Sequence, residues 1–247
     1  MKSDGLLIVL GDQLFPVEYL KQVKCHRVFM AEDLGLCTES KHHKLKILMF
    51  FTAMREYRDA LIKSGFEVFY HSISEPSFAD SFQQKLDNII ITQQITEVNY
   101  FEIDDQLFDK QIEQFRSNSS AKWVLHPSPK FICSRKKFLD FAKGKKSLRM
   151  ASFYQMMRRD LNVLMVDAQP AGGRWSFDEE NRKKLPSGIH LPDVPRTSLS
   201  REKKLLSDIE KCFPDHPGSM SNLWMPTTRD QSISWLDNFL THKFVNF

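Results

Sequence analysis

A run of five aliphatic residues, Leu6–Leu10, is followed directly by Gly11, Asp12 and Gln13. Such a run is too short for an isolated helix and is typical of a strand buried on both faces at the centre of a parallel sheet. Gly11 ends the run, so the two polar residues follow the strand at its carboxyl end. Ligands bind at this edge of an open α/β sheet, where the strand order reverses. The stretch predicts a central strand beside a binding edge, although a first strand with an ordinary polar turn fits the same residues.

Four more strand-like runs follow, and each is separated from the next by a helical pattern. These runs are His26–Ala31, Phe66–Tyr70, Val98–Glu102 and Lys122–Leu125. The helical patterns are Phe15–Lys24, Glu39–Ser64, Ser77–Gln93 and Asp105–Arg116. A loop is expected at Leu34–Thr38. The alternation indicates an α/β fold with a doubly wound, five-stranded parallel sheet in the order 3-2-1-4-5.

The alternation stops near Pro129, and a mostly helical region follows. Its expected helices are Ser134–Lys143, Ser147–Asn162, Ser198–Cys212 and Thr228–His242, with no further strand. A compact turn is expected at Gly172–Phe177, and three prolines between Leu185 and Pro195 predict an extended connector. We therefore expect an α/β Rossmann-like domain at residues 1–128 and a connector at residues 129–227.

Composition excludes several classes of protein. No apolar run approaches the ~18 residues of a membrane helix, and the N-terminus lacks the pattern of a signal peptide, so we expect a cytoplasmic protein without a membrane partner. The four cysteines are widely spaced and form no CxxC pair, which argues against a metal site or a disulfide framework within this chain. Neither a GxGxxG nor a GxxxxGK[ST] motif is present.

Positive charge is concentrated in one segment. Residues 130–160 contain ten Lys or Arg and two Asp, a local net charge of +8 on a chain whose net charge is +4. The segment is compatible with a nucleic-acid partner, and equally with a solvated helix face. The candidate phosphate-binding residues are Arg135, Lys136, Lys137, Lys143, Lys145 and Lys146. Adjacent His42 and His43 point about 100° apart on a helix and favour a helix start over a metal site.

Two blocks carry a resemblance to a known family. The first is LRMASFYQMMRR, at residues 148–159, and the second is GGRWSFDEENR, at residues 172–182. Together with Leu10–Leu14 and the run from His42 to Arg55, they resemble the deoxyribodipyrimidine photolyase-related family, the prokaryotic branch of photolyases and cryptochromes that includes (6-4) photolyases. The resemblance covers the chain in order.

The resemblance implies an α/β antenna domain, a connector, and a helical domain that carries FAD and a [4Fe–4S] cluster and performs light-driven DNA repair. Residues 228–247 match only the first helix of that helical domain. We therefore expect this chain to be the N-terminal part of such a flavoprotein, with no catalysis of its own. Its expected partners are the helical FAD domain, in the same or a separate chain, and DNA, weakly at most. The alternative is a free-standing chromophore-binding or protein-interaction module, as in cryptochrome-like light sensing.

The resemblance also implies a site for an antenna chromophore, 6,7-dimethyl-8-ribityllumazine, near the ends of the first two strands. The residues expected to contribute are Gly11, Asp12, Gln13, Glu32, Leu36 and Phe50. Leu36 stands where family members that bind lumazine well have an acidic residue, and Phe50 stands where they have a smaller aliphatic one. An aromatic side chain there could fill the cleft or stack on the ligand. No residue is assigned as catalytic or metal-binding.

Four arginines in the two blocks have two possible roles. Arg149, Arg158, Arg159 and Arg174 could contact phosphate, or they could pair with the acidic residues at 178–180 and hold the connector together. We favour the structural role, with Trp175 and Phe177 as packing residues.

Overall fold

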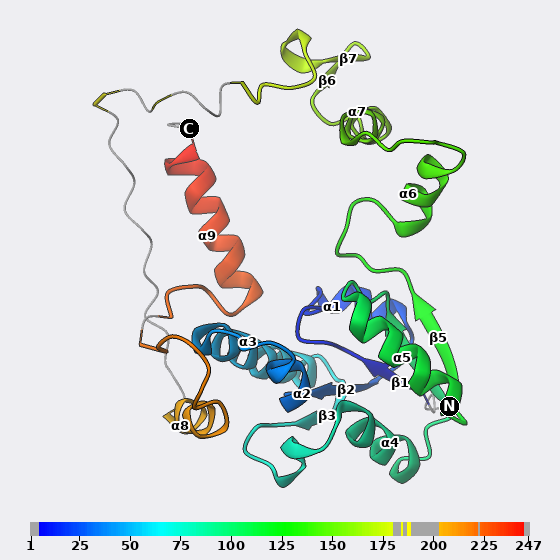
Figure 1. Cartoon of the computed structure of the whole chain (residues 1–247), viewed down its shortest axis with the longest axis vertical. Helices are drawn as coiled ribbons and strands as arrows, with labels where there is room; N and C mark the ends of the chain where they lie inside the picture. The colour runs from blue at the N-terminus through cyan, green and yellow to red at the C-terminus, as the bar shows by residue number, and fades with distance from the viewer. Residues whose placement is uncertain (1–4, 180–183, 185–186, 189–202, 222, 245–247) are drawn as a thin grey trace. The chain divides into compact units, whose positions relative to one another are not determined.

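The computed structural model describes residues 5–179, 184, 187–188, 203–221 and 223–244 (Figure 1). The chain divides into two compact units. Unit 1 comprises Met1–Lys130 and Asp193–Phe247, and unit 2 comprises Phe131–Pro192. The expected proline-rich connector at Pro186, Pro192 and Pro195 lies outside the described residues.

Unit 1 is built on a parallel sheet. Its five strands are β1 (Gly5–Ile8), β2 (Arg27–Ala31), β3 (Glu67–His71), β4 (Glu97–Phe101) and β5 (Lys122–His126). They lie in the order β3-β2-β1-β4-β5, and every neighbouring pair is parallel, which confirms the fold class and the predicted order. β1 lies at the centre, where Leu7 is opposite Val28 on one side and Asn99 on the other.

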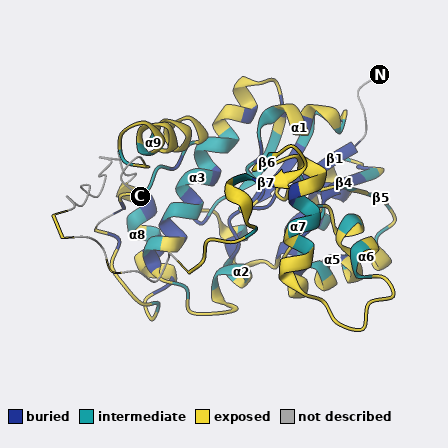
Figure 2. Cartoon of the chain, turned by 90° about the horizontal axis from the view of Figure 1, so that it is seen from above, coloured by how far each residue is buried: buried dark blue, intermediate teal, exposed yellow. Residues whose placement is uncertain are grey.

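Helices cover both faces of this sheet. They are α1 (Val17–Gln22), α2 (Leu34–Thr38), α3 (Lys44–Lys63), α4 (Phe82–Thr92), α5 (Gln106–Asn118) and α8 (Lys203–Cys212), with a 3₁₀ turn, η1, at Pro76–Ala79. None of the residues of the following helix, α9 (Arg229–His242), is buried. Because side chains of a strand alternate between faces, Leu7 and Val9 pack with α3, whereas Leu6 and Ile8 pack with α4 and α5. All four are at most 2% exposed, and β1 is dark blue in Figure 2.

The structure corrects three helix boundaries. The expected loop at Leu34–Thr38 is the short helix α2, because the Asp33 side chain accepts a hydrogen bond from the Leu36 N–H and caps its first turn. α3 begins at Lys44 rather than near Glu39, since the His43 ring nitrogen Nδ1 accepts from the Leu45 N–H. α4 begins at Phe82, after a capping box on Ser81, so the expected start at Ser77 was wrong.

α8 completes the hydrophobic core on the α3 side of the sheet. Leu205, Ile209 and Phe213 are at most 2% exposed and belong to the same core cluster as Leu7 and Met30. Lys44 donates to Glu210 at 2.6 Å, which joins the first turn of α3 to α8. A distant part of the chain therefore holds the end of α3 that faces the cavity described below.

Unit 2 contains α6 (Arg135–Ala142), α7 (Met150–Leu161), the strands β6 (Met165–Val166) and β7 (Gln169–Pro170), and a 3₁₀ turn, η2 (Ala171–Gly173). No strand was expected here, so the antiparallel β6–β7 hairpin is a correction. Its two-residue loop has positive φ at Asp167 and Ala168 (48° and 62°), the conformation of a tight hairpin turn. The usual sequence signal for that turn includes glycine, which is absent here.

Candidate functional site

A cavity of about 230 Å³ lies at the carboxyl ends of β1, β2 and β4. This volume is slightly below the range of about 300–1,000 Å³ that is usual for ligand pockets. β1 is the strand from which the chain proceeds to both sides of the sheet, so the cavity lies where the strand order reverses. Its lining comprises Leu10, Gly11, Asp12, Ala31, Asp33, Leu36, Cys37, His42, Lys46, Ile47, Phe50, Phe51, Met54, Ile103, Asp105 and Phe108.

α3 provides the longest wall of the cavity. Lys46, Phe50 and Met54 are spaced four residues apart and therefore follow one another along a single face of the helix. Gly11 packs against the same face, because a Cβ atom at this position would lie 2.9 Å from Met54 Sδ and 3.3 Å from Phe50 Cδ1. The glycine after β1 thus allows the backbone to approach α3 closely.

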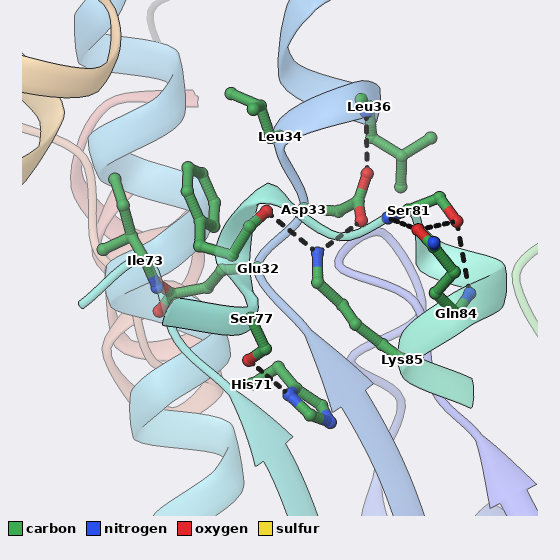
Figure 3. A network of polar contacts seen from close by, with 12 residues as sticks. Glu32, Asp33, Leu34, Leu36, His71, Ile73, Ser77, Ser81, Gln84 and Lys85 are labelled. Carbon is green, nitrogen blue, oxygen red and sulfur yellow. Dashed lines mark hydrogen bonds and ion pairs between the residues drawn. The ribbon is translucent and has the colours of Figure 1, made fainter. Parts of the chain in front are cut away.

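The two acidic residues after β2 hold the neighbouring walls. Glu32 is fully buried, and its carboxylate accepts from Arg55 Nε (2.7 Å), Arg55 Nη2 (3.1 Å), Tyr70 Oη (2.7 Å) and the Ile73 N–H (2.6 Å). Figure 3 shows Glu32 and Ile73 in this region. Burial and the Glu32 carboxylate raise the pKa of Tyr70, so the phenol keeps the proton that it donates. All of these bonds fix the end of β2 to α3 and β3.

Asp33 forms a second buried network on the opposite side of β2. Its Oδ2 lies 2.8 Å from Lys85 Nζ, and the two side chains are 3% and 0% exposed (Figure 3). Lys85 also donates to the Phe78 carbonyl at 3.3 Å. Asp33 Oδ1 accepts from the Leu36 N–H at 3.0 Å. The pair therefore joins α4 to α2, whose residues Leu36 and Cys37 line the cavity.

Two more aspartates lie at the cavity. Asp12 Oδ2 accepts from Lys130 Nζ at 2.8 Å, and the same Nζ lies 3.1 Å from Asp104. Asp105 caps α5, since its Oδ1 accepts from the Leu107 and Phe108 N–H groups at 2.9 Å each. The carboxylate of Asp12 is 40% exposed and stays accessible to a ligand at the rim.

The remaining polar lining residues are Cys37, His42 and Lys46. Burial, together with the carboxylates of Asp33 and Glu32, raises the pKa of the Cys37 thiol to about 12. Burial and nearby Lys46 lower the pKa of His42, so its ring is neutral at pH 7. Lys46 Nζ donates to His42 Nδ1 at 3.3 Å.

The structure brings four of the six expected chromophore residues together. Gly11, Asp12, Leu36 and Phe50 line the cavity. Gln13 is 2% exposed and donates from Nε2 to the Glu102 carbonyl at 3.0 Å, outside the lining. Glu32 also lies outside the lining, in the network with Arg55 described above.

Sequence reasoning missed Asp33 and Lys85. Asp33 follows β2 as Glu32 does, and its position after a strand was already a signal. The signal for Lys85 was its spacing: α4 buries Phe82, Leu86, Ile89 and Ile90 at helical intervals, and Lys85 occupies the same stripe. A lysine that is buried within such a stripe needs a charged or polar partner, although the same pattern is also typical of an exposed helix edge.

The two blocks that carry the resemblance meet within unit 2 at Arg158. This side chain donates to the Val163 carbonyl (3.2 Å), the Trp175 carbonyl (3.3 Å) and the Leu164 carbonyl, and the residue is 6% exposed. Its guanidinium also lies over the Trp175 ring, 5.1 Å from the centroid. Arg158 therefore joins the two blocks within unit 2, and it does so by hydrogen bonds to carbonyls rather than by the expected pairs with acidic residues.

Five of the six candidate phosphate-binding residues are exposed, and Lys137 is partly exposed. Within unit 2, Lys136 pairs with Asp140 at 2.7 Å and Lys137 pairs with Asp160 at 2.9 Å. Lys145 donates to the Phe141 carbonyl and lies over its ring. Arg135, Lys143 and Lys146 extend the same exposed basic segment.

No group of three or more His, Cys, Asp or Glu side chains that could hold a metal ion is found among the described residues. The cysteines Cys25, Cys37, Cys133 and Cys212 are free thiols. None of the described helices is both long and apolar enough to cross a membrane.

Residues 7–224 match the family model for deoxyribodipyrimidine photo-lyase-related proteins. A (6-4) photolyase of Agrobacterium fabrum is 30% identical over 246 residues, which is 98% of this chain and 48% of that protein. The chain therefore spans about half the length of this relative. An uncharacterized protein of Acanthamoeba polyphaga mimivirus is 24% identical over 198 residues, 76% of this chain and 98% of that protein.

Proposed function

Because the chain belongs to the deoxyribodipyrimidine photolyase-related protein family, we propose that it is the N-terminal part of a photolyase-like flavoprotein for light-dependent DNA repair. The cavity beside β1 holds its antenna chromophore, 6,7-dimethyl-8-ribityllumazine. FAD and a [4Fe–4S] cluster belong to a helical domain, in the same or a separate chain. One observation carries the proposal: the family match coincides with an apolar cavity at the switch point of the sheet.

The lining fits a flat heteroaromatic ring with a polar chain. Phe50, Phe51 and Phe108 provide aromatic surface, and the carboxylate of Asp12 provides a hydrogen-bond acceptor at the rim. When bound, the chromophore absorbs light and passes the excitation energy to a flavin. The residues of this chain hold the ring, keep water from its faces and orient it through Asp12.

The proposal includes weak DNA binding and a cytoplasmic location. The exposed basic segment of unit 2 supports contact with phosphates, which is independent of sequence. The free cysteines are typical of a reducing compartment.

Equilibrium titration with 6,7-dimethyl-8-ribityllumazine, followed by its fluorescence, tests the chromophore site. Asp12→Ala should weaken binding by roughly 1–3 kcal/mol, the usual value of a lost hydrogen-bond partner in a partly buried site. Asp104→Ala is the matched control, because Asp104 contacts the same Lys130 Nζ but does not line the cavity. Equal affinities of the two variants would place the chromophore elsewhere.

A second function, a free-standing chromophore-binding or interaction module, is favoured by one observation. The mimivirus protein matches this chain along 98% of its own length, so the matched region there makes up nearly a whole protein. The exposure of five aromatic residues bears instead on the first function, since a large exposed apolar surface would suit a separate helical domain. Two of them, Trp224 and Phe244, are 41% and 57% exposed, whereas Phe153, Trp235 and Phe239 are only partly exposed. Expression in a photolyase-deficient host tests what the two functions share, because light-dependent repair by the chain alone would contradict a separate catalytic domain.

A further inference from the structure

Lys46 and His42 form one end of the cavity. Lys46 lies in the first turn of α3, is exposed, and contacts His42 Nδ1 (3.3 Å) and the Phe50 ring (5.9 Å to the centroid). In the part of the chain that the structure describes, its ammonium group forms no ion pair with a carboxylate. A neutral imidazole is a weaker acceptor for an ammonium group than a phosphate or a carboxylate.

The acidic groups of the lining already have partners. Asp33 pairs with Lys85, and Asp12 pairs with Lys130. Asp105 accepts two N–H groups at the first turn of α5, where the helix dipole also favours a negative charge. Among the described residues that line the cavity, Lys46 is therefore the positively charged side chain that can still bind an anion.

The two ends of the cavity have opposite character. Lys46 and Met54 are eight residues apart on α3, about 12 Å along the helix axis. Gly11 packs on Met54, so the adjacent Asp12 lies toward the far end from Lys46. Phe50 lies between the two ends and presents its ring to the cavity. A ring placed near Phe50 therefore has the Asp12–Lys130 ion pair at one end and the Lys46 ammonium group at the other.

We propose that this cavity selects a heteroaromatic ligand whose side chain ends in an anionic group, a phosphate or a carboxylate, bound by Lys46 beside His42. The proposal rests on the proposed function, because it concerns the same chromophore cavity. It goes further by stating that a ribityl phosphate binds more tightly than the neutral ribityl chain. Lys46 is exposed, so the expected preference is modest, about two- to fivefold in Kd.

Two pairs of ligands test the preference. In each pair the ring and the ribityl chain are identical and only the phosphate differs: 6,7-dimethyl-8-ribityllumazine against its 5′-phosphate, and riboflavin against FMN. Ligand fluorescence gives the Kd of each for the whole chain at low salt. The phosphorylated member should bind about two- to fivefold more tightly, and the difference should shrink as salt is raised.

Substitutions assign the preference to Lys46. Lys46→Gln should remove the difference within each pair, and Lys46→Arg should keep it. Lys63→Gln is the matched control, because it removes the same charge from the exposed last turn of α3, about 25 Å along the axis from Lys46. Circular dichroism confirms that each variant is folded.

The outcomes separate this proposal from the proposed function. Equal binding of the lumazine and its phosphate overturns the anion preference and leaves the chromophore site standing. Binding of FMN without binding of either lumazine supports the anion preference and contradicts the lumazine assignment. Binding of none of the four ligands overturns both. A phosphate preference that persists unchanged in Lys46→Gln overturns the anion site at Lys46 and leaves the chromophore site standing.

Discussion

Removing Lys85 should destabilise unit 1 far more than removing an exposed lysine. In Lys85→Met the Asp33 carboxylate keeps its bond to the Leu36 N–H but loses the ammonium group at 2.8 Å, in a site where both side chains are at most 3% exposed. Breaking one partner of a buried ion pair typically costs about 3–5 kcal/mol, because the remaining charge is neither solvated nor paired. For a domain of this size the loss corresponds to a fall in Tm of about 6–20 °C.

Urea denaturation followed by far-ultraviolet circular dichroism measures this loss. The matched control is Lys122→Met, which breaks the pair with Glu97 at the same distance of 2.8 Å, with side chains 73% and 36% exposed. That substitution should cost less than about 1 kcal/mol. A third variant, Asp33→Asn with Lys85→Met, removes both charges and should recover most of the stability, since Asn caps a helix as well as Asp does.

Two results would refute this reasoning. If Lys85→Met cost no more than Lys122→Met, the Asp33–Lys85 pair would not be desolvated as described. If the double variant were as unstable as Lys85→Met, the loss would come from the packing of the lysine chain and not from the unpaired carboxylate.

Three other predictions concern different parts of the chain. Burial raises the pKa of the Cys37 thiol to about 12, so iodoacetamide at pH 8 should label the exposed Cys212 well before Cys37. The labelling rate of Cys37, measured by peptide mass spectrometry, should rise about tenfold per pH unit. Arg158→Lys removes the guanidinium group that donates to three carbonyls. Amide hydrogen exchange should therefore rise across residues 150–177 and stay unchanged in the five-stranded sheet of unit 1. DNA binding through residues 130–160 should engage about two to four phosphates, so the logarithm of the binding constant should fall against the logarithm of the salt concentration with a slope of about −2 to −4. A clear preference for a (6-4) or cyclobutane lesion over undamaged duplex would contradict this prediction of sequence-independent phosphate contact.

The sheet could be predicted because its signals are local. Each strand is a short run rich in β-branched, aliphatic or aromatic residues, and right-handed crossovers leave few possible orders. α2 could not be predicted in the same way. It has five residues, too few to show a helical period, and it depends on the Asp33 cap and on packing over the cavity. The β6–β7 hairpin was missed because Asp167 and Ala168 adopt a turn that the usual glycine signal would have marked.

The candidate site could be predicted as an edge of the sheet but not as a set of contacts. Gly11 and Asp12 were found because they end the central strand. The wall formed by Lys46, Phe50 and Met54 depends on the register of α3, and His43 sets that register by capping the helix later than the apolar pattern suggested. The Asp33–Lys85 pair joins residues 52 positions apart. Its sequence signal was weak, since a single lysine in an apolar stripe is also typical of an exposed helix edge.

The contacts of Glu32 and Asp33 show which side chains around the cavity stabilise the fold and which can bind a ligand. Successive residues at the end of a strand point to opposite faces, so Glu32 reaches Arg55 on α3 and Asp33 reaches Lys85 on α4. Each carboxylate is held by a cation from its own face and by a backbone N–H, of Ile73 or of Leu36. Asp33 cannot turn toward a ligand without removing the carboxylate partner of the buried Lys85, which costs several kcal/mol. Glu32 cannot turn without breaking the hydrogen bonds that its fully buried carboxylate accepts. Recognition therefore has to come from side chains that are still accessible at the two ends of the cavity, Asp12 and Lys46, and substitutions there should change ligand affinity with little effect on folding.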